Sequence, residues 1–330
     1  MVKKTCIVTG AAGFIGSHMV DFLLEKNFYV IGIDNFSNGS IQNLKSAKKN
    51  KKFKLIKKDF SKLNKKQIPK NIYYIFHFAG IGSIVPSIEN PLKYFQNNAV
   101  KTIEFLELLR NNNIDLKKLV YAASSSCYGL FSKKTNENTK ISIQHPYAYS
   151  KYIGEQSCLL WSKIYNLPIV SIRIFNAYGV RFKTTGAYGS VIGVFLRQKL
   201  SNYPLTICGD GKQKRDYIYV SDVVKAFYVA AGSKYTNRVY NLGYGRPNSI
   251  NKMSKLISND FQKIPYRKGE PFATHADISR IKKDLKWKPE VSFKSGMKII
   301  MQNINEWKTA PLWTTKGIKN YTKNWTKYIK

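Results

Sequence analysis

Short apolar runs alternate with longer amphipathic segments along the first half of the chain. The runs show little polar alternation, which is typical of strands buried on both faces of a parallel sheet. Between them, apolar residues recur at helical spacing from Phe14 onward, from Pro91 to Arg110 and from Tyr147 to Tyr165. This alternation of strand and helix predicts an α/β fold with a doubly wound parallel sheet. The predicted strands are Cys6–Val8, Tyr29–Ile33, Phe53–Lys57, Ile72–Phe78, Lys118–Ala123 and Leu167–Phe175.

The pattern loosens after Asn176, where Gly and Thr residues separate shorter elements. We expect these elements to form a smaller α/β lobe, with a cleft between the lobes at the carboxyl ends of the parallel strands. The predicted first domain is 1–176 with a return segment at about 213–243, and the second is 177–212 with 244–330. The predicted elements are helices at Val191–Leu200 and Val220–Ala231, strands at Leu205–Cys208 and Arg238–Gly243, and a helical tail with several Trp residues.

Three glycines, Gly10, Gly13 and Gly16, lie between the first strand and the first helix. In that position glycine permits a tight turn, lets the backbone approach a pyrophosphate and lets the helix pack closely on the strand. The helix N-terminus, at Phe14 and Ile15, would present free N–H groups to the pyrophosphate. The alternative is an ordinary strand–turn–helix with tolerated glycines.

The second predicted strand ends in Asp34, which lies 18 residues beyond Gly16. This is near the usual distance for the acidic residue that hydrogen-bonds the adenosine ribose. A carboxylate there would repel a 2′-phosphate. The glycine turn and Asp34 together therefore predict a Rossmann-type dinucleotide site that takes NAD rather than NADP.

The charge of the chain is unusual, with 55 basic against 19 acidic residues and a formal net charge of +36. We interpret this mainly as a lysine-rich composition, because the lysines are scattered, and we expect no nucleic-acid partner. A basic surface would still attract anionic nucleotide sugars or lipid headgroups. No apolar run is long enough to span a bilayer, so we expect no integral membrane association. Four scattered cysteines without metal-ligand spacing predict no metal site and fit a reducing, cytoplasmic compartment.

Candidate chemistry lies at the start of the helix predicted from Tyr147. Tyr147 and Lys151 are four residues apart and therefore share one helix face. An ammonium group near a phenol stabilises the phenolate and lowers its pKa toward working pH. Ser124, at the end of the neighbouring strand, could share the proton path. The alternative is a Tyr–Lys pair on a solvated helix face.

These motifs carry a family resemblance. Thr9-Gly-Ala-Ala-Gly-Phe-Ile-Gly16, the Ser-Ser-Ser-Cys-Tyr-Gly loop from Ser124 and Tyr147-x-x-x-Lys151 together resemble the extended short-chain dehydrogenase/reductase superfamily. Within it, the chain resembles the NAD-dependent nucleotide-sugar epimerases and dehydratases, especially the UDP-hexose 4-epimerases. The resemblance implies a Rossmann lobe, a smaller nucleotide-sugar lobe and a homodimer.

The resemblance also implies roles for individual residues. Ser124 would be the catalytic hydroxyl, Tyr147 the base, and Lys151 the group that holds the nicotinamide ribose. Arg215 and Arg267 would clamp the diphosphate of the substrate, a task that suits bidentate Arg better than Lys; without the family match, surface salt bridges are an even alternative. The other implied cofactor-binding residues are Gly10, Gly13, Phe14, Ile15, Gly16, Asp34, Asn35, Asp59, Phe60, Phe78, Ala79, Gly80 and Asn98. The other implied substrate-binding residues are Ser83, Ser126, Asn176, Glu270 and Thr274.

Two positions indicate the branch of the family. The 4,6-dehydratases carry acidic residues just after the catalytic hydroxyl, where this chain has Ser125 and Ser126. Thr274 stands where a bulky Tyr narrows the pocket of some epimerases, so a small residue there would admit N-acetylated sugars. The expected function is a 4-epimerase of the UDP-GlcNAc/UDP-Glc type that acts through a transient 4-keto sugar, with the loop Tyr178–Ser190 giving the sugar room to turn. The alternatives are a 4,6-dehydratase, a decarboxylase, a 4-dehydrogenase, an NAD-sensing regulator and a basic surface-binding protein.

Overall fold

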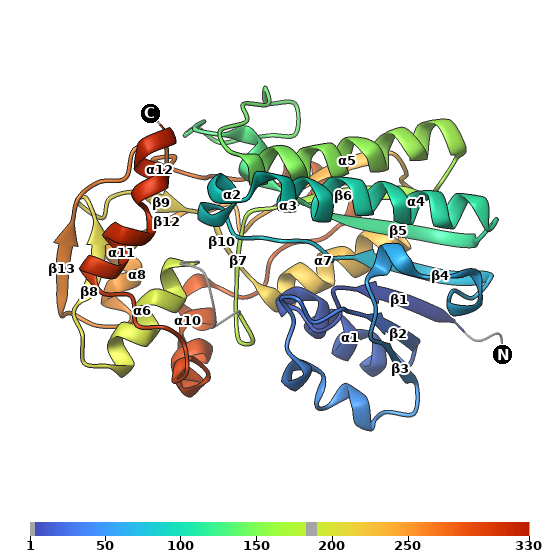
Figure 1. Ribbon diagram of the computed structural model, residues 1–330, viewed down its shortest axis with the longest axis horizontal. Coiled ribbons are helices and arrows are strands. Elements are labelled where there is room, and N and C mark those ends of the chain that lie inside the picture. The colour runs from blue at the N-terminus through green and yellow to red at the C-terminus, as the bar shows by residue number, and fades with distance from the viewer. Residues whose placement is uncertain (1–3, 183–189, 330) are drawn as a thin grey trace.

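A seven-stranded parallel sheet forms the centre of the larger lobe (Figure 1). The structure is a computed structural model that describes residues 4–182 and 190–329. The β1 strand is buried along its whole length, which accounts for its apolar run. Most residues of β5 and β6 are buried too, although β6 also carries Ser171 and Arg173. The predicted doubly wound sheet is confirmed. In sheet order the strands are β11 (Arg238–Leu242), β6 (Ile169–Ile174), β5 (Asp115–Ser124), β4 (Asn71–His77), β1 (Thr5–Thr9), β2 (Tyr29–Ile33) and β3 (Phe53–Ile56).

Helices cover both faces of this sheet. On one face, α1 (Phe14–Glu25) packs beside α7 (Val220–Gly232); on the other, α4 (Lys101–Asn111) packs beside α5 (Pro146–Tyr165) (Figure 1). Each face has its own apolar core, one of which takes in Met19 and Phe227 and the other Phe105 and Cys158. The order of strands places the polar residues that follow β1, β2, β4, β5 and β6 along one edge of the sheet.

The helix predicted for 91–110 is continuous in direction but not uniform. It consists of α3 (Pro91–Phe95), a π turn at Gln96–Val100 and then α4. Sequence spacing alone does not reveal the π turn. Such turns occur frequently at functional sites, and this one carries Asn98.

The smaller lobe is built from three two-stranded sheets and several helices. Its strands β8 and β13 are parallel, β9 and β12 are antiparallel, and β7 and β10 are parallel. The sequence predicted β8 but not β7, β9, β10, β12 or β13; the first four of these have only two or three residues and leave no periodicity. These elements are β7 (Asn176–Tyr178), α6 (Val191–Leu200), β8 (Leu205–Cys208), β9 (Lys214–Arg215), β10 (Tyr217–Tyr219), β12 (Asn248–Ser249), α8 (Ile250–Lys255), β13 (Phe261–Ile264) and α10 (Phe293–Gln302).

One segment of the predicted second domain packs on the first. The α9 helix (Ser279–Leu285) contributes Ile281 and Leu285 to the core beneath the seven-stranded sheet, together with Trp287. The exact boundaries of the two domains otherwise remain a prediction. Within the described ranges, 4–182 and 190–329, no helix is long and apolar enough to cross a membrane.

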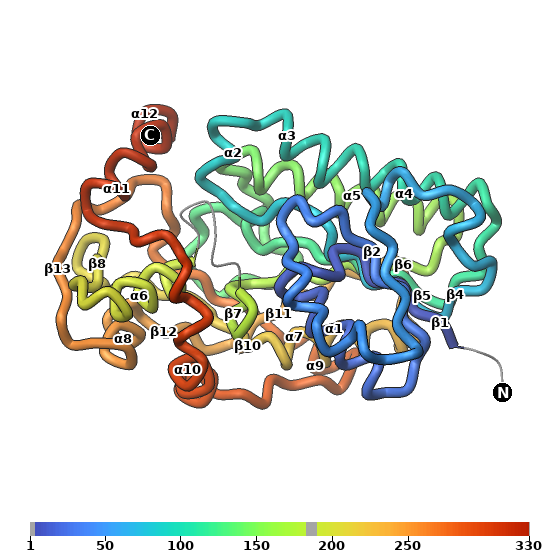
Figure 2. Tube along the Cα trace, turned by 60° about the horizontal axis from the view of Figure 1, so that its bottom comes forward, coloured from blue at the N-terminus to red at the C-terminus, as the bar shows by residue number. Residues whose placement is uncertain are grey.

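The chain ends in α11 (Thr315–Tyr321) and α12 (Lys323–Tyr328). Both Figure 1 and Figure 2 place α12 beside α2 (Val85–Glu89), which follows β4 in the larger lobe, and residue contacts join the two helices. The end of the chain therefore returns to the larger lobe after passing through the smaller one.

Candidate active site

The glycine turn after β1 is tightly packed on the loop after β4. Gly10 has a φ of +67°, and a Cβ there would lie 2.8 Å from the backbone nitrogen of Ala79. A Cβ on Gly16 would clash with the carbonyl oxygen of Gly10. Side chains at these two positions are therefore excluded by the backbone itself.

The N-terminus of α1 has no side-chain cap. Gly13 occupies the N-cap position, and Phe14 and Ile15 begin the helix. The first N–H groups of α1 are thus available for an anion, and the helix dipole favours negative charge there. Phe14 and Ile15 also pack against the core of the smaller lobe, so this turn lies where the two lobes meet.

Asp34 is held rigidly at the end of β2. Its Oδ2 accepts a hydrogen bond from the Ala12 N–H (2.9 Å) and its Oδ1 accepts one from the Phe36 N–H (2.7 Å). Burial raises the pKa of the Asp34 carboxyl, although these two N–H donors oppose the shift. Asp34 thereby fixes the loop that follows β2 against the glycine turn.

The predicted adenine side contains Asn35, Asp59 and Phe60. Asn35 Nδ2 donates to Asp59 Oδ2 (3.3 Å), and Lys101 Nζ donates to the same oxygen (2.8 Å). Partial burial opposes ionisation of Asp59, but the bonds from Lys101 and Ser61 and the charge of Lys101 together outweigh it and leave the pKa below its usual value. The Phe60 side chain is buried against His77 and Phe105, so a role of Phe60 at the adenine would fall to its backbone.

Phe78, Ala79 and Gly80 form the loop at the end of β4. The Phe78 ring packs on Phe227 beneath the sheet, and the Ala79 N–H donates to Thr9 Oγ1 (3.3 Å). Gly80 has a φ of +154°, and a Cβ there would lie 2.7 Å from Asn98 Oδ1 and 3.9 Å from Lys151 Nζ. This loop therefore brings the backbone close to the catalytic candidates.

Asn98 ties the β4 loop to helix α5. It is fully buried, its Oδ1 accepts from the Ile81 N–H (2.8 Å), and its Nδ2 donates to the Ile81 carbonyl (3.1 Å) and to Ser150 Oγ (3.0 Å). The π turn directs the side chain into this position. Asn98 thus holds the loop after β4 and helix α5 together at the site.

Ser124 ends β5, and Tyr147 and Lys151 lie in the first two turns of α5. The Ser124 hydroxyl is hydrogen-bonded to Tyr147, which lowers the pKa of that phenol, while burial raises it more strongly. Burial lowers the pKa of Lys151 to about 8, so its ammonium form is present below that pH. The Lys151 ammonium also lies 4.4 Å from the centre of the Tyr121 ring. Tyr149, two residues along the helix, is 48% exposed and lies on another face.

Asn176 and Thr274 form one hydrogen-bonded unit. The Thr274 hydroxyl accepts from Asn176 Nδ2 (2.9 Å) and from the Asp216 backbone N–H (3.1 Å). Both lone pairs of that hydroxyl are thereby used, so toward a sugar it can only donate. Thr274 therefore holds the Asn176 side chain in place, in addition to leaving space as a small residue.

Arg215 and Arg267 converge on Glu270. Arg267 Nη1 donates to Glu270 Oε1 (2.6 Å), and Arg215 Nη2 lies 3.5 Å from Glu270 Oε2. Both guanidinium groups are largely buried, with 14% and 11% of the side chain exposed, so these are not surface salt bridges. Two convergent guanidinium groups that share one carboxylate suit a diphosphate.

The last two predicted substrate residues lie in loops. Ser126 accepts a hydrogen bond from Ser124 (3.1 Å between the two Oγ atoms), and Ser83 lies between β4 and α2. The loop predicted to let the sugar turn, Tyr178–Ser190, falls mainly in 183–189, outside the described residues.

Comparisons with known proteins agree with this geometry. The sequence pattern of the NAD dependent epimerase/dehydratase family matches residues 6–243. The chain belongs to this family. A putative UDP-glucose 4-epimerase of Methanocaldococcus jannaschii is 35% identical over 305 residues, which is 89% of this chain and 96% of the relative.

Solved structures of the same family superimpose closely. UDP-glucuronic acid 4-epimerase from Bacillus cereus, solved with UDP-glucuronic acid and NAD, gives a TM-score of 0.85 at 30% identity and covers 92% of this chain and 99% of that one. UDP-N-acetylglucosamine 4-epimerase from Methanobrevibacter ruminantium M1, solved with UDP-N-acetylmuramic acid, gives 0.84 at 32% identity and covers 92% and 100%.

The family is NAD-dependent, and the residues present fit NAD. The uncapped N-terminus of α1 suits the pyrophosphate, and the constrained Asp34 carboxylate suits an adenosine ribose without a 2′-phosphate. Within the described ranges, no group of three or more His, Cys, Asp or Glu side chains could hold a metal ion.

Sequence reasoning missed three residues that organise the site. Asp216 is fully buried and accepts from the N–H groups of Tyr244 (2.7 Å), Gly245 (3.0 Å) and Ala276 (2.9 Å), joining three loops of the substrate side. His145 caps α5, since its Nδ1 accepts from the Ala148 N–H (3.2 Å). Trp325 packs beside His145. Of these, only Asp216 had a signal in the sequence, as an acidic residue directly before the apolar run 217–220.

Proposed function

We propose that this protein is an NAD-dependent UDP-sugar 4-epimerase. The observation that carries the proposal is the placement of Ser124, Tyr147 and Lys151 at the carboxyl edge of the sheet, with Arg215 and Arg267 converging in the smaller lobe. A nucleotide diphosphate held by the two arginines would leave its sugar near the phenol. The relatives described above act on UDP-sugars at C4, which supports the same chemistry here.

The chain's own groups would handle the proton of the sugar 4-hydroxyl. Tyr147 as phenolate accepts that proton, with Ser124 hydrogen-bonded along the path and lowering the pKa of the phenol, while Lys151 on the same helix would hold the nicotinamide ribose. When bound at this site, NAD would supply the hydride acceptor for C4 and the hydride donor for its return. Tyr147 gives the proton back to the oxygen at C4 when the 4-keto sugar has presented its other face. Atoms and electrons balance within one cycle, and the product is the C4 epimer.

The rival on this scaffold is a 4,6-dehydratase. Removal of water across C5–C6 needs an acid and a base near the sugar, and Ser125 and Ser126 follow the catalytic hydroxyl in this chain. The carboxylates of the described substrate side are already engaged, Asp216 by backbone N–H groups and Glu270 by the two arginines. This arrangement favours epimerisation.

The deciding experiment is product analysis. The purified protein is incubated with UDP-glucose, UDP-GlcNAc and UDP-glucuronic acid in turn, and the products are identified by proton NMR. We expect inversion at C4 without loss of mass. A 4-keto-6-deoxy product, with loss of water, would assign the protein to the dehydratases instead.

We also propose a homodimer formed through α3 and α5. Apolar side chains are exposed on this face, including Leu92 at 67% and Ile164 at 56%. Tyr149, Leu160 and Ile164 are spaced so that they share one face of α5. Exposed apolar surface of this kind marks protein interfaces. Sedimentation velocity should show a dimer for the native chain and a monomer for Ile164→Glu, and a native monomer would disprove it.

A further inference from the structure

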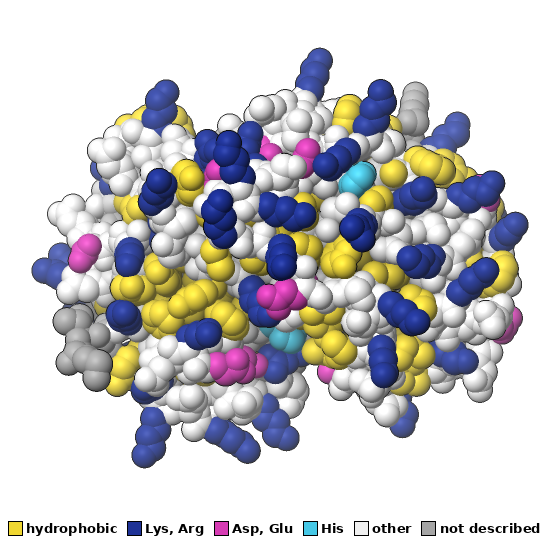
Figure 3. Space-filling view, turned by 180° about the vertical axis from the view of Figure 1, so that it is seen from behind, with side chains coloured by type: hydrophobic (Ala, Val, Ile, Leu, Met, Phe, Trp, Pro, Cys, Tyr) yellow, Lys and Arg dark blue, Asp and Glu magenta, His cyan; other side chains and the backbone are white. Residues whose placement is uncertain are grey.

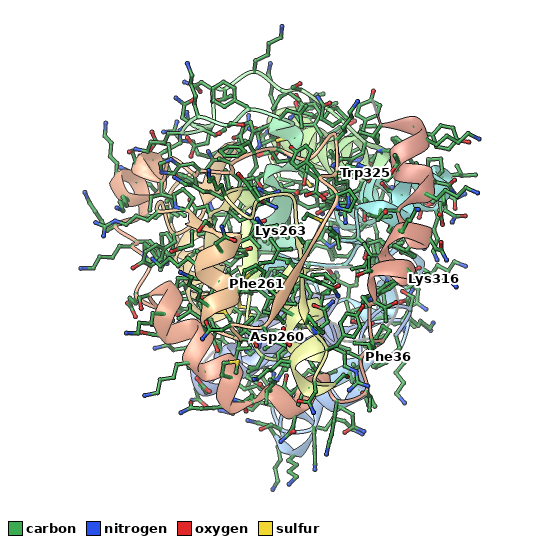
Figure 4. The ribbon with its side chains drawn as sticks, turned by 90° about the vertical axis from the view of Figure 1, so that its left-hand side faces the viewer. Phe36, Asp260, Phe261, Lys263, Lys316 and Trp325 are labelled. Atoms are coloured by element: carbon green, nitrogen blue, oxygen red, sulfur yellow. The ribbon has the colours of Figure 1, made fainter. Side chains whose placement is uncertain are left out.

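The C-terminal helix α12 connects the two lobes at the active site. It lies beside α2, and Asn324 Nδ2 donates to Glu89 Oε1 (3.1 Å) at the end of that helix. Trp325 on α12 is only 4% exposed although it stands five residues before Lys330. Figure 4 shows Trp325 between its own helix and the chain that continues from β13.

On one side, Trp325 contacts the loop that carries the predicted diphosphate clamp. Its Nε1–H donates to the Lys268 carbonyl oxygen (2.7 Å), so the bond falls directly between Arg267 and Glu270. The next residue, Gly269, has a φ of +77°, and a Cβ there would clash with Ile329, which follows α12. The loop 267–270 therefore packs closely against α12 and Ile329.

On the other side, Trp325 contacts the start of the catalytic helix. Its ring centre lies 6.1 Å from that of His145. His145 in turn lies parallel to the Tyr147 ring, with 5.9 Å between centres and 7° between planes, and caps α5 through Nδ1. Trp325 therefore packs beside His145, which lies against the proposed base Tyr147. Trp325 also bonds to the backbone of Lys268, which is next to Arg267 in the chain.

We propose that Trp325 is a positioning residue for the nucleotide sugar, one that sets the clamp loop 267–270 at a fixed distance from the catalytic helix α5. The reaction requires the diphosphate to rest on Arg267 while the sugar 4-hydroxyl rests at Tyr147, and these two residues belong to different lobes. Small errors in such distances are costly for catalysis. The inference rests on the proposed function, because it assumes that the clamp binds a nucleotide diphosphate.

The test uses full-length protein with its NAD and three variants. Trp325→Phe keeps an aromatic ring but loses the Nε1–H donor, Trp325→Ala loses both, and Tyr328→Ala changes a 60% exposed residue of the same helix. The readouts are the Kd of UDP by calorimetry, KM and kcat with the substrate identified above, and the NAD content.

We expect Trp325→Ala to raise the Kd of UDP and the KM by about tenfold or more, and Trp325→Phe by about threefold, as for one lost neutral hydrogen bond. Tyr328→Ala should change neither. NAD content should stay constant throughout, because the dinucleotide site lies elsewhere, whereas a general loss of structure would lower NAD content and leave the KM of the intact fraction unaltered.

The experiment distinguishes failure of the proposed function from failure of the inference about Trp325. If native protein does not bind UDP, the proposed function fails before the variants are compared. If native protein binds UDP and both Trp325 variants bind it equally well, the inference is overturned. Should Trp325→Ala fail to fold, Trp325→Phe decides alone, and an unchanged Kd and KM in that variant would refute the role of the Nε1–H.

Discussion

At the scale of single residues, Tyr147 is distinguished from Tyr149 by its surroundings. Tyr147 bonds to Ser124 and is half-buried, whereas Tyr149 is exposed against Phe95. Tyr147→Phe should lower turnover by about a hundredfold or more, because a positioned acid/base typically contributes about 10²–10⁴-fold. Initial rates and released NAD would be measured on the same samples, and NAD content should not change. Tyr149→Phe is the matched control; equal losses in the two variants would show that Tyr147 is not the base.

Thr274 has two separable effects on the pocket. It leaves space beside the sugar, and its hydroxyl holds Asn176. Thr274→Tyr should depress epimerisation of UDP-GlcNAc relative to UDP-glucose by roughly ten- to a hundredfold, since a buried clash costs about 1–3 kcal/mol. Competition between the two substrates measures this ratio directly.

The control for that prediction is Thr274→Val, which keeps the size and removes the hydroxyl. It should slow both substrates alike, because it removes the bonds that the hydroxyl accepts from Asn176 and from the Asp216 N–H but keeps the space beside the sugar. A ratio that stays constant in Thr274→Tyr would mean that Thr274 does not face the 2-substituent of the sugar.

At the scale of elements, the N-terminus of α5 depends on a neutral histidine. His145 Nδ1 can accept from the Ala148 N–H only without a proton, and burial lowers its pKa to about 4 from the ordinary 6.5. Between these values the unfolded chain binds a proton that the folded chain does not, so the free energy of unfolding falls as pH falls from about 6.5 to about 4. Thermal unfolding followed by circular dichroism should show this loss.

The matched variant is His145→Asn, which caps a helix at any pH. Its melting temperature should fall less steeply over the same pH range than that of the native chain. Some loss should remain, because burial also lowers the pKa of His77, to about 3, in both proteins. Parallel curves for the two proteins would contradict the assignment of this pH dependence to His145.

The elements that the sequence predicted well are those whose pattern is local. The strands of the large sheet were found because each is an apolar run, and Tyr147 with Lys151 because a spacing of four fixes one helix face. The short pairs β7–β10 and β9–β12 join residues far apart and leave no such pattern. The contact of Asn324 with Glu89 spans 235 positions, and Trp325 in a lysine-rich tail looked like any other aromatic residue.

At the scale of the whole molecule, the formal net charge of +36 affects stability. Figure 3 shows Lys and Arg side chains spread over the face in view rather than gathered in one patch, which fits a general composition better than a nucleic-acid site. Evenly spread like charges repel one another and destabilise the compact state. In 0.01 M salt the screening length is about 30 Å, comparable to a lobe, and in 1 M salt it is about 3 Å.

The melting temperature should therefore rise by several degrees when sodium chloride is increased from about 0.01 M to about 0.3 M, with most of the gain at the low end, where the screening length changes most. Chloride is the appropriate anion, because sulfate or phosphate could occupy the site between Arg215 and Arg267 and stabilise the fold by binding. The scans are run at pH 7.5, above the titration of His145, so that only screening varies. Potassium chloride should give the same curve as sodium chloride, since ionic strength alone is at work. A melting temperature that is flat or falls with chloride would show that the positive charges are compensated locally, by ion pairs such as Lys101–Asp59, rather than by the solvent.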